Sequence, residues 1–215
     1  MRSGPVHRSI LAVDIERSTS PARTNPIREE LRQEVYRVLD TAMRTAGIGD
    51  GHCDPLADLG DGVLALIRPA DEVPKTLLLN PLIPALVRLL ADRNAGLDGT
   101  ERCRRQLRLR VVIHAGEVHY DGKGCFGEAL DVAFRLLDSP GLKKRLREVT
   151  SPLVVVVSED IYWSIVRHEY EGISGSAFQP LVRVTVAGRR RQGWVHVPPP
   201  AMPARASKAN SMAAA

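Results

Sequence analysis

The stretch from Ser9 to Ile15 reads SILAVDI, and the stretch from Leu59 to Ile67 reads LGDGVLALI. Each contains a short, nearly continuous apolar run, which is typical of a strand buried on both faces. Asp14 lies near the end of the first run, and Asp61 lies in a Gly-Asp-Gly turn just before the second. We therefore expect two interior strands, each bordered by one carboxylate.

Further helices and strands are expected on both sides of these runs. Apolar residues recur at helical spacing from Ile27 to Met43, and Asn25 and Pro26 fit the start of that helix. Other helices are expected over about 82–94, 128–138, 142–148 and 159–167. Further strands are expected over 107–114, 117–120, 153–157, 181–186 and 194–197. A polar loop is expected over 94–105. This mixed order favours an α/β sandwich with an antiparallel or mixed sheet over a doubly wound parallel one.

Composition sets the limits on function. The 215 residues carry a formal charge of +5, which allows an anionic partner, and the three cysteines lack a paired or metal-binding spacing. A reduced, cytoplasmic setting fits those cysteines. The most apolar stretch, Leu77 to Leu90, is too short and interrupted for a membrane span. Only three Phe and four Tyr are present, which disfavours a nucleic-acid-binding surface built from stacked aromatics.

The chain is expected to form one domain with short flanking segments. Residues 1–8 are expected to be an N-terminal arm and residues 9–197 the folded domain. Residues 198–215, rich in Pro, Ala and Ser, are expected to be a disordered tail.

Asp14 and Asp61 are the residues with the clearest chemical potential. Mg²⁺ is typically held by one or two carboxylates together with phosphate oxygens of the substrate. Two acids on neighbouring strands would suit one or two such ions above a triphosphate. Taken alone, however, a Gly-Asp-Gly sequence is more often a plain hairpin turn.

Three segments in order narrow this choice. They are ILAVDIERSTS from residue 10, DLGDGVLAL from residue 58, and RVVIHAGEVHYDGKGCFGEALDVAFRL from residue 110. Their sequence and order resemble the three signature blocks of the class III adenylate and guanylate cyclases. The resemblance implies a ferredoxin-like βαββαβ core with a mixed or antiparallel sheet and extra C-terminal strands. It also implies a head-to-tail homodimer with sites at the dimer interface.

The resemblance also implies roles for individual residues. Asp14, Asp61 and the carbonyl of Ile15 would hold Mg²⁺ or Mn²⁺, and the amides of Glu16, Arg17, Ser18 and Thr19, next to Ile15, would bind phosphates. Arg135 would stabilise the phosphate charge that develops as the 3′-hydroxyl attacks. Asp131 stands where the family has a ribose-orienting asparagine, and Ala57 and Gly124 stand at the two base-reading positions.

Two functions therefore remain open. The first is a metal-dependent nucleoside triphosphate-binding enzyme with weak or non-standard cyclisation to a 3′,5′-cyclic nucleotide. The second is a catalytically degenerate module of the same fold that senses nucleotide and acts through a soluble protein partner. An anionic Asp131 near the phosphates would slow ring closure, and neither Ala57 nor Gly124 offers a polar side chain that could read a purine.

Overall fold

Strand β1 (Val6–Ile15) lies inside an eight-stranded mixed sheet in this computed structural model, which describes residues 4–170 and 172–200. The strand order is β2-β3-β1-β4-β6-β8-β7, and β5 pairs with β4. The other strands are β2 (Ala57–Asp58), β3 (Gly62–Ile67), β4 (Leu109–Tyr120), β5 (Cys125–Phe126), β6 (Leu153–Ser158), β7 (Phe178–Val186) and β8 (Arg189–His196). The helices are α1 (Asn25–Thr45), α2 (Leu82–Asn94), α3 (Gly99–Arg105), α4 (Glu128–Leu137), α5 (Pro140–Glu148) and α6 (Glu159–Ser164).

The register of β1 fixes the centre of the sheet. β1 runs antiparallel to both of its neighbours, and Asp14 pairs with Gly62 on β3 and with Arg110 on β4. β4 then pairs with β6 in parallel, and β6 pairs antiparallel with the C-terminal β7–β8 hairpin. The mixed sheet and the extra C-terminal strands agree with the expectation from the sequence.

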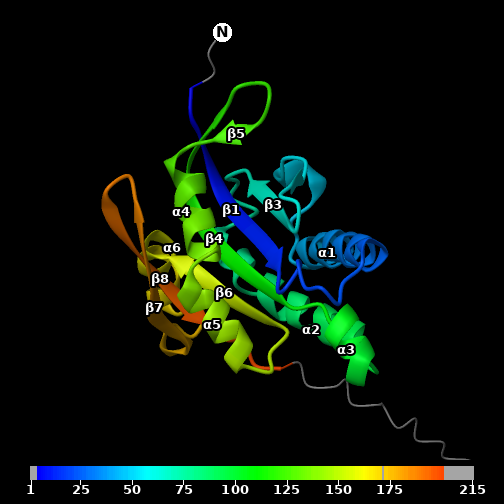
Figure 1. Cartoon of the computed structure of the whole chain (residues 1–215). Helices are drawn as coiled ribbons and strands as arrows, with labels where there is room; N and C mark the ends of the chain where they lie inside the picture. Colours follow the sequence, from blue (N-terminus) through cyan, green and yellow to red (C-terminus); the bar gives the residue numbers. More distant parts are fainter. Residues whose placement is uncertain (1–3, 171, 201–215) are drawn as a thin grey trace, which may run out of the picture.

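Apolar side chains cover both faces of the sheet. Because side chains alternate along a strand, Leu11 and Val13 face one cluster, which packs against α1 and α2. Ile10 and Ala12 face a second cluster, which packs against α4 and α5. Figure 1 shows α1 and α4 on either side of the blue strand β1. This two-sided burial explains why SILAVDI is nearly continuous in apolar residues.

Helix α3 corrects the expectation of a loop over 94–105. The segment is polar and has no buried residue, so it lacks the apolar stripe by which helices are recognised. Its helical form is supported by charge pairs instead: Glu101 pairs with Arg104 three residues on and with Arg105 four residues on. β1 also begins at Val6, so residues 6–8 belong to the sheet, whereas they were expected to form part of an N-terminal arm.

The expected tail lies mostly outside the described residues. The structure describes Pro198 to Pro200, and the expectation for 201–215 stays a prediction. Among the described residues, no helix combines the length and apolarity needed to cross a membrane.

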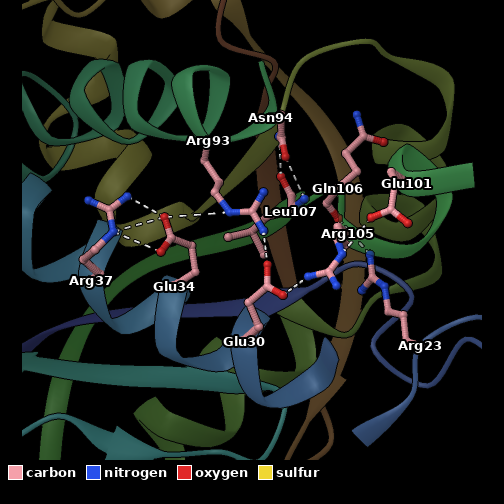
Figure 2. A network of polar contacts seen from close by, with 10 residues as sticks. All are labelled: Arg23, Glu30, Glu34, Arg37, Arg93, Asn94, Glu101, Arg105, Gln106 and Leu107. Carbon is pink, nitrogen blue, oxygen red and sulfur yellow. Dashed lines mark hydrogen bonds and ion pairs between the residues drawn. The ribbon is translucent and has the colours of Figure 1, made fainter. Parts of the chain in front are cut away.

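An ion-pair network ties α1, α2 and α3 together (Figure 2). Glu30 of α1 accepts from Arg93 of α2 at 2.8 Å and also from Arg105 of α3. The side chain of Asn94 exchanges two 2.8 Å hydrogen bonds with the backbone of Leu107, just before β4. The network therefore holds the start of β4 against the two N-terminal helices.

His114 gives the fold a testable pH dependence. Burial lowers the pKa of this histidine to about 4, with Asp160 opposing the shift, and its Nδ1 lies 2.7 Å from Ser158 Oγ. The unfolded chain protonates His114 below about pH 6.5. Between there and pH 4 the unfolded state binds more protons, so this site lowers the stability as the pH falls, by about 2–3 kcal/mol in total.

We expect His114→Gln to lose less stability than the wild type between pH 7 and pH 4.5 in urea unfolding experiments. His168→Gln, at an exposed position, is the matched control and should follow the wild type. An identical loss in wild type and His114→Gln would contradict a buried neutral histidine.

Candidate functional site

Asp14 lies at the end of β1 and pairs directly with an arginine. Arg110 Nη2 donates to Asp14 Oδ2 at 2.6 Å, and both side chains are largely buried. Burial raises the pKa of Asp14 to about 6, while Arg110 opposes the shift. The other oxygen, Oδ1, is buried without a hydrogen-bond partner among the described residues. Asp14 therefore presents one satisfied oxygen and one unsatisfied oxygen.

Asp61 lies in the turn between β2 and β3, next to the residue that pairs with Asp14. Its main-chain oxygen accepts from the Ile15 amide at 3.0 Å, and its carboxylate accepts from Ser18 Oγ at 2.5 Å. The negative charge of Asp61 also contributes to the raised pKa of Asp14. The structure therefore brings the two acids to the same end of adjacent strands, as the sequence predicted.

This close approach depends on Gly62. A Cβ atom built at Gly62 would lie 2.2 Å from the carbonyl oxygen of Val13 and 3.2 Å from the Cα atom of Asp14. Real Cβ contacts are not that short, so any other residue would push β3 away from β1. The second glycine of Gly-Asp-Gly is thus required by strand packing.

The loop after β1 offers three of the four amides expected to bind phosphate. Glu16 is the exception, because its amide donates to the Arg108 carbonyl at 2.8 Å and its carboxylate accepts from Arg108 Nη1 at 3.0 Å. The amides of Arg17, Ser18 and Thr19 have no backbone acceptor among the described residues. Arg17 adopts a left-handed φ of 55°, and consecutive N–H groups in such a turn form a concavity suited to anions.

Asp131 and Arg135 lie on α4, whereas Asp14 lies near the end of β1 and Asp61 in the β2–β3 turn. Both α4 residues are exposed and line a cavity together with Thr185 and Ala187 of the β7–β8 hairpin. In the described part of the chain, no hydrogen bond or ion pair connects either residue to Asp14 or Asp61. One chain therefore separates the residues for which the resemblance implies a shared role.

Comparison with known proteins finds similarity in structure alone. No protein-family model and no curated protein matches the sequence. Among solved structures, an adenylate/guanylate cyclase/hydrolase from Silicibacter pomeroyi matches with a TM-score of 0.61 at 18% identity, covering 91% of this chain and 99% of that chain. The adenylyl cyclase CyaB from P. aeruginosa matches with a TM-score of 0.60 at 14% identity, covering 93% of this chain and 97% of that chain.

A third structure, the guanylyl cyclase Cya2, matches with a TM-score of 0.53 at 17% identity, over 91% of this chain and 94% of its own. The chain has the class III nucleotidyl cyclase fold. Within that fold, identities below 20% make this chain a divergent example.

The two acids suit a divalent cation in this nucleotidyl cyclase fold. Carboxylate oxygens are the ligands Mg²⁺ prefers, and the unsatisfied Oδ1 of Asp14 is a buried oxygen available for one. The described residues contain no cluster of three or more His, Cys, Asp or Glu suited to a metal. Phosphate oxygens, water and a main-chain carbonyl would have to complete the coordination.

The two positions that the sequence resemblance assigns to base reading, Ala57 and Gly124, carry no polar side chain. Ala57 lies on β2 and packs beside the apolar cluster under α4. Gly124 lies in the turn between β4 and β5, where its amide donates to the Asp121 carboxylate at 3.0 Å. Neither position can supply a side-chain hydrogen bond to a base edge.

The sequence interpretation missed several cations at this site. A pocket of about 330 Å³ next to the loop after β1 is lined by Arg23, Arg28 and Arg32, along with Ser18 and Asp61. Arg110, which pairs with Asp14, was also missed. Arg28 and Arg32 are separated by one helical turn, so their spacing alone was a local signal for a shared face. Nothing local in the sequence connects Arg110 to Asp14.

Proposed function

We propose that this protein binds a nucleoside triphosphate together with Mg²⁺ or Mn²⁺ and converts it slowly to a 3′,5′-cyclic nucleotide and pyrophosphate. The observation that carries this proposal is the position of Asp14, at the end of β1, next to Asp61 in the β2–β3 turn. Both lie beside a loop whose amides of Arg17, Ser18 and Thr19 have no backbone acceptor among the described residues. The nucleotidyl cyclase fold supports it, because two structures of the same fold belong to an adenylyl and a guanylyl cyclase.

In this proposal Asp14 and Asp61 would hold the metal ion together. Asp14 Oδ1 and the Asp61 carboxylate would bind it, with the Ile15 carbonyl as a third ligand from the protein. The amides of Arg17, Ser18 and Thr19 would bind the phosphates. A bound divalent ion supplies charge neutralisation and orients the triphosphate. Arg110 already occupies Asp14 Oδ2, so this carboxylate has one oxygen left to bridge to a metal.

The assembly we propose is a C2 homodimer with two equivalent shared sites. Asp131 and Arg135 lie in a different cavity from the one that Asp61 lines, so a single chain leaves the site incomplete. A second copy would supply its α4 across the interface, as the family resemblance implies.

The three cysteines, all free thiols, support a reducing compartment such as the cytoplasm.

A second candidate function is a nucleotide-sensing module with little catalysis, acting through a soluble protein partner. It is favoured by the anionic side chain of Asp131 on α4 and by the apolar Ala57 on β2. The two functions share the nucleotide and metal site and differ in turnover.

The metal site can be tested with Asp14→Asn and Asp61→Asn. We expect each variant to weaken Mn²⁺-dependent binding of ATP, GTP, CTP or UTP by about 10-fold or more, because a charged ligand contributes at least that much. Asp92→Asn, an exposed acid on α2, should bind as the wild type does. Isothermal titration with and without EDTA gives the affinities, and mass spectrometry of the mixtures identifies any cyclic product.

Asp61→Asn is the variant less prone to unfold the chain, because Asp61 is exposed. Asp14→Asn, in contrast, leaves the buried Arg110 without its carboxylate partner. Binding by both variants equal to the wild type would show that the metal site is wrong.

Asp131→Asn separates the two candidate functions. Removing the anion should raise cyclic nucleotide formation by up to about 10²- to 10³-fold, the size of one transition-state contact. The turnover number, measured at saturating triphosphate and Mn²⁺, is the readout. A fall in turnover would mean that Asp131 contributes positively. If neither the wild type nor Asp131→Asn forms cyclic product, the sensing module is favoured.

The shared site predicts complementation between damaged chains. Wild-type protein should sediment at twice the 23.6 kDa chain mass when MnATP is present. Asp14→Asn and Arg135→Ala should each lose cyclic nucleotide formation, and an exchanged equal mixture should recover about a quarter of the wild-type turnover. That fraction follows because half of the dimers are mixed and each mixed dimer has one intact site of two. Recovery of none, or a strict monomer, would contradict the assembly.

A further inference from the structure

An uncharged cavity lies beside the N-terminal half of α2, and we name it the α2–β8 cavity. It has a volume of about 430 Å³ and is lined by residues of α2, β6 and β8 and of the segments before β7 and after β8. It shares no lining residue with the pockets that contain Asp61 or Asp131. A ligand of this cavity is therefore separate from the nucleotide and metal ion proposed above.

The floor of the α2–β8 cavity is part of the apolar core. Ile83 and Val87 of α2 and Val155 of β6 are buried members of the cluster that packs against α1 and α2. The residues at its mouth are exposed: Gly172, Ser174, Ala177, Pro199 and Pro200. The cavity therefore leads from the surface to the edge of the core, which gives a ligand a way in.

No side chain that lines the α2–β8 cavity is an acid, a lysine or an arginine. In a chain in which 26% of the residues are charged, the lining consists of Leu, Ile, Val, Pro, Phe, Ala and Gly with one Ser and one His. An ion that entered would lose its hydration without gaining a partner of opposite charge. The lining therefore selects against nucleotides, phosphate and metal ions and favours an uncharged ligand.

Water solvates such a cavity poorly. At ~30 Å³ per molecule, its volume of about 430 Å³ corresponds to roughly 14 waters, each of which needs 2–4 polar partners. The polar side chains of the lining are Ser174 and His196, and Ser174 Oγ already lies 3.0 Å from Ser176 Oγ. An apolar cavity of about 150 Å³ is enough to bind benzene, so this one has room for two fused rings.

His196 offers a ligand one hydrogen-bond acceptor. Its Nδ1 lies 3.2 Å from the Ala177 carbonyl oxygen, which can only accept, so Nδ1 carries the hydrogen. Burial lowers the pKa of His196, with the bond to Ala177 opposing the shift, so the ring is neutral at pH 8. Nε2 is then an acceptor, and it has no hydrogen-bond partner among the described residues. Phe178 stacks on the ring with 4.8 Å between centroids and holds it in place.

We propose that the α2–β8 cavity binds an uncharged, largely apolar molecule of about two fused rings that carries one hydroxyl or N–H donor. The rings pack against Ile83, Val87 and Val155, and the donor bonds to Nε2 of His196. Apolar contact in a poorly hydrated cavity supplies most of the binding free energy. The single hydrogen bond selects ligands with a donor over those without one.

The test uses 2-naphthol as the probe, titrated into the full chain by isothermal titration calorimetry at pH 8 without nucleotide or metal. We expect saturable binding with a Kd below about 1 mM. Quinoline, which has two fused rings and no donor, should bind about 2- to 10-fold more weakly, the range of one hydrogen bond. 2-Naphthoate, which carries a carboxylate, should bind about 10-fold more weakly or worse.

His196→Phe separates the hydrogen bond from the packing. It keeps a ring beside Phe178 and removes the acceptor, so 2-naphthol should bind about 2- to 10-fold more weakly and quinoline within about twofold of the wild type. Val87→Phe should fill part of the cavity and weaken both probes by about 10-fold or more. His168→Phe, at an exposed position outside the cavity, is the matched control and should bind both probes as the wild type does.

No saturable binding of 2-naphthol by the wild type would overturn the proposal, as would equal weakening of both probes in His196→Phe. The chain continues from Pro200 at the mouth, and Met202 is its next large apolar residue. Met202→Ser should leave the affinity for 2-naphthol unchanged. A gain of about 10-fold or more in that variant would mean that the C-terminal segment of the chain itself occupies the cavity, which would also overturn the proposal.

Discussion

The antiparallel register of β1 with β3 and β4 is the constraint on which the site depends. It places Asp14 opposite Gly62 and Arg110 at once, so one strand position meets both a turn acid and a buried cation. A slip of one residue would move Asp14 to the other face of the sheet and would place Ile15 on the face where Asp14 now lies. The apolar residues of β1 that fill both clusters oppose such a slip, because every one of them would change sides. The same register of β1 is therefore required both for packing of the core and for the geometry of the site.

The sheet divides the molecule into two functional sides. The loop after β1, the β2–β3 turn and α1 line one pocket, whereas Asp131 and Arg135 of α4 line another together with the β7–β8 hairpin. The two pockets share no lining residue, so within one chain the residues proposed to act together belong to separate pockets. The proposed dimer would bring the two pockets of different copies together.

Local patterns in the sequence predicted the interior strands, most helices and the adjacency of Asp14 and Asp61. They failed at α3, whose helix is supported by Glu101 and two arginines and has no apolar stripe. The family resemblance also implied a phosphate-binding amide at Glu16, although that N–H is bonded to Arg108, a residue 92 positions away. Arg110 and Arg23 were missed for the same reason, since pairing across strands and with distant carbonyls leaves no periodic trace. Contacts between residues far apart in the chain are what the sequence does not display.

Gly62 has a consequence for how this fold is recognised among distant sequences. A side chain there would collide with Val13, and Gly116 and Gly193 are similarly restricted by Ala129 and Val156, at 2.7 Å and 2.8 Å. Core positions can exchange Leu, Ile and Val while keeping volume, so their identity drifts quickly. A position that admits no Cβ cannot drift in this way. Such glycines act as landmarks, and aligning sequences on them should reveal kinship that overall identity conceals.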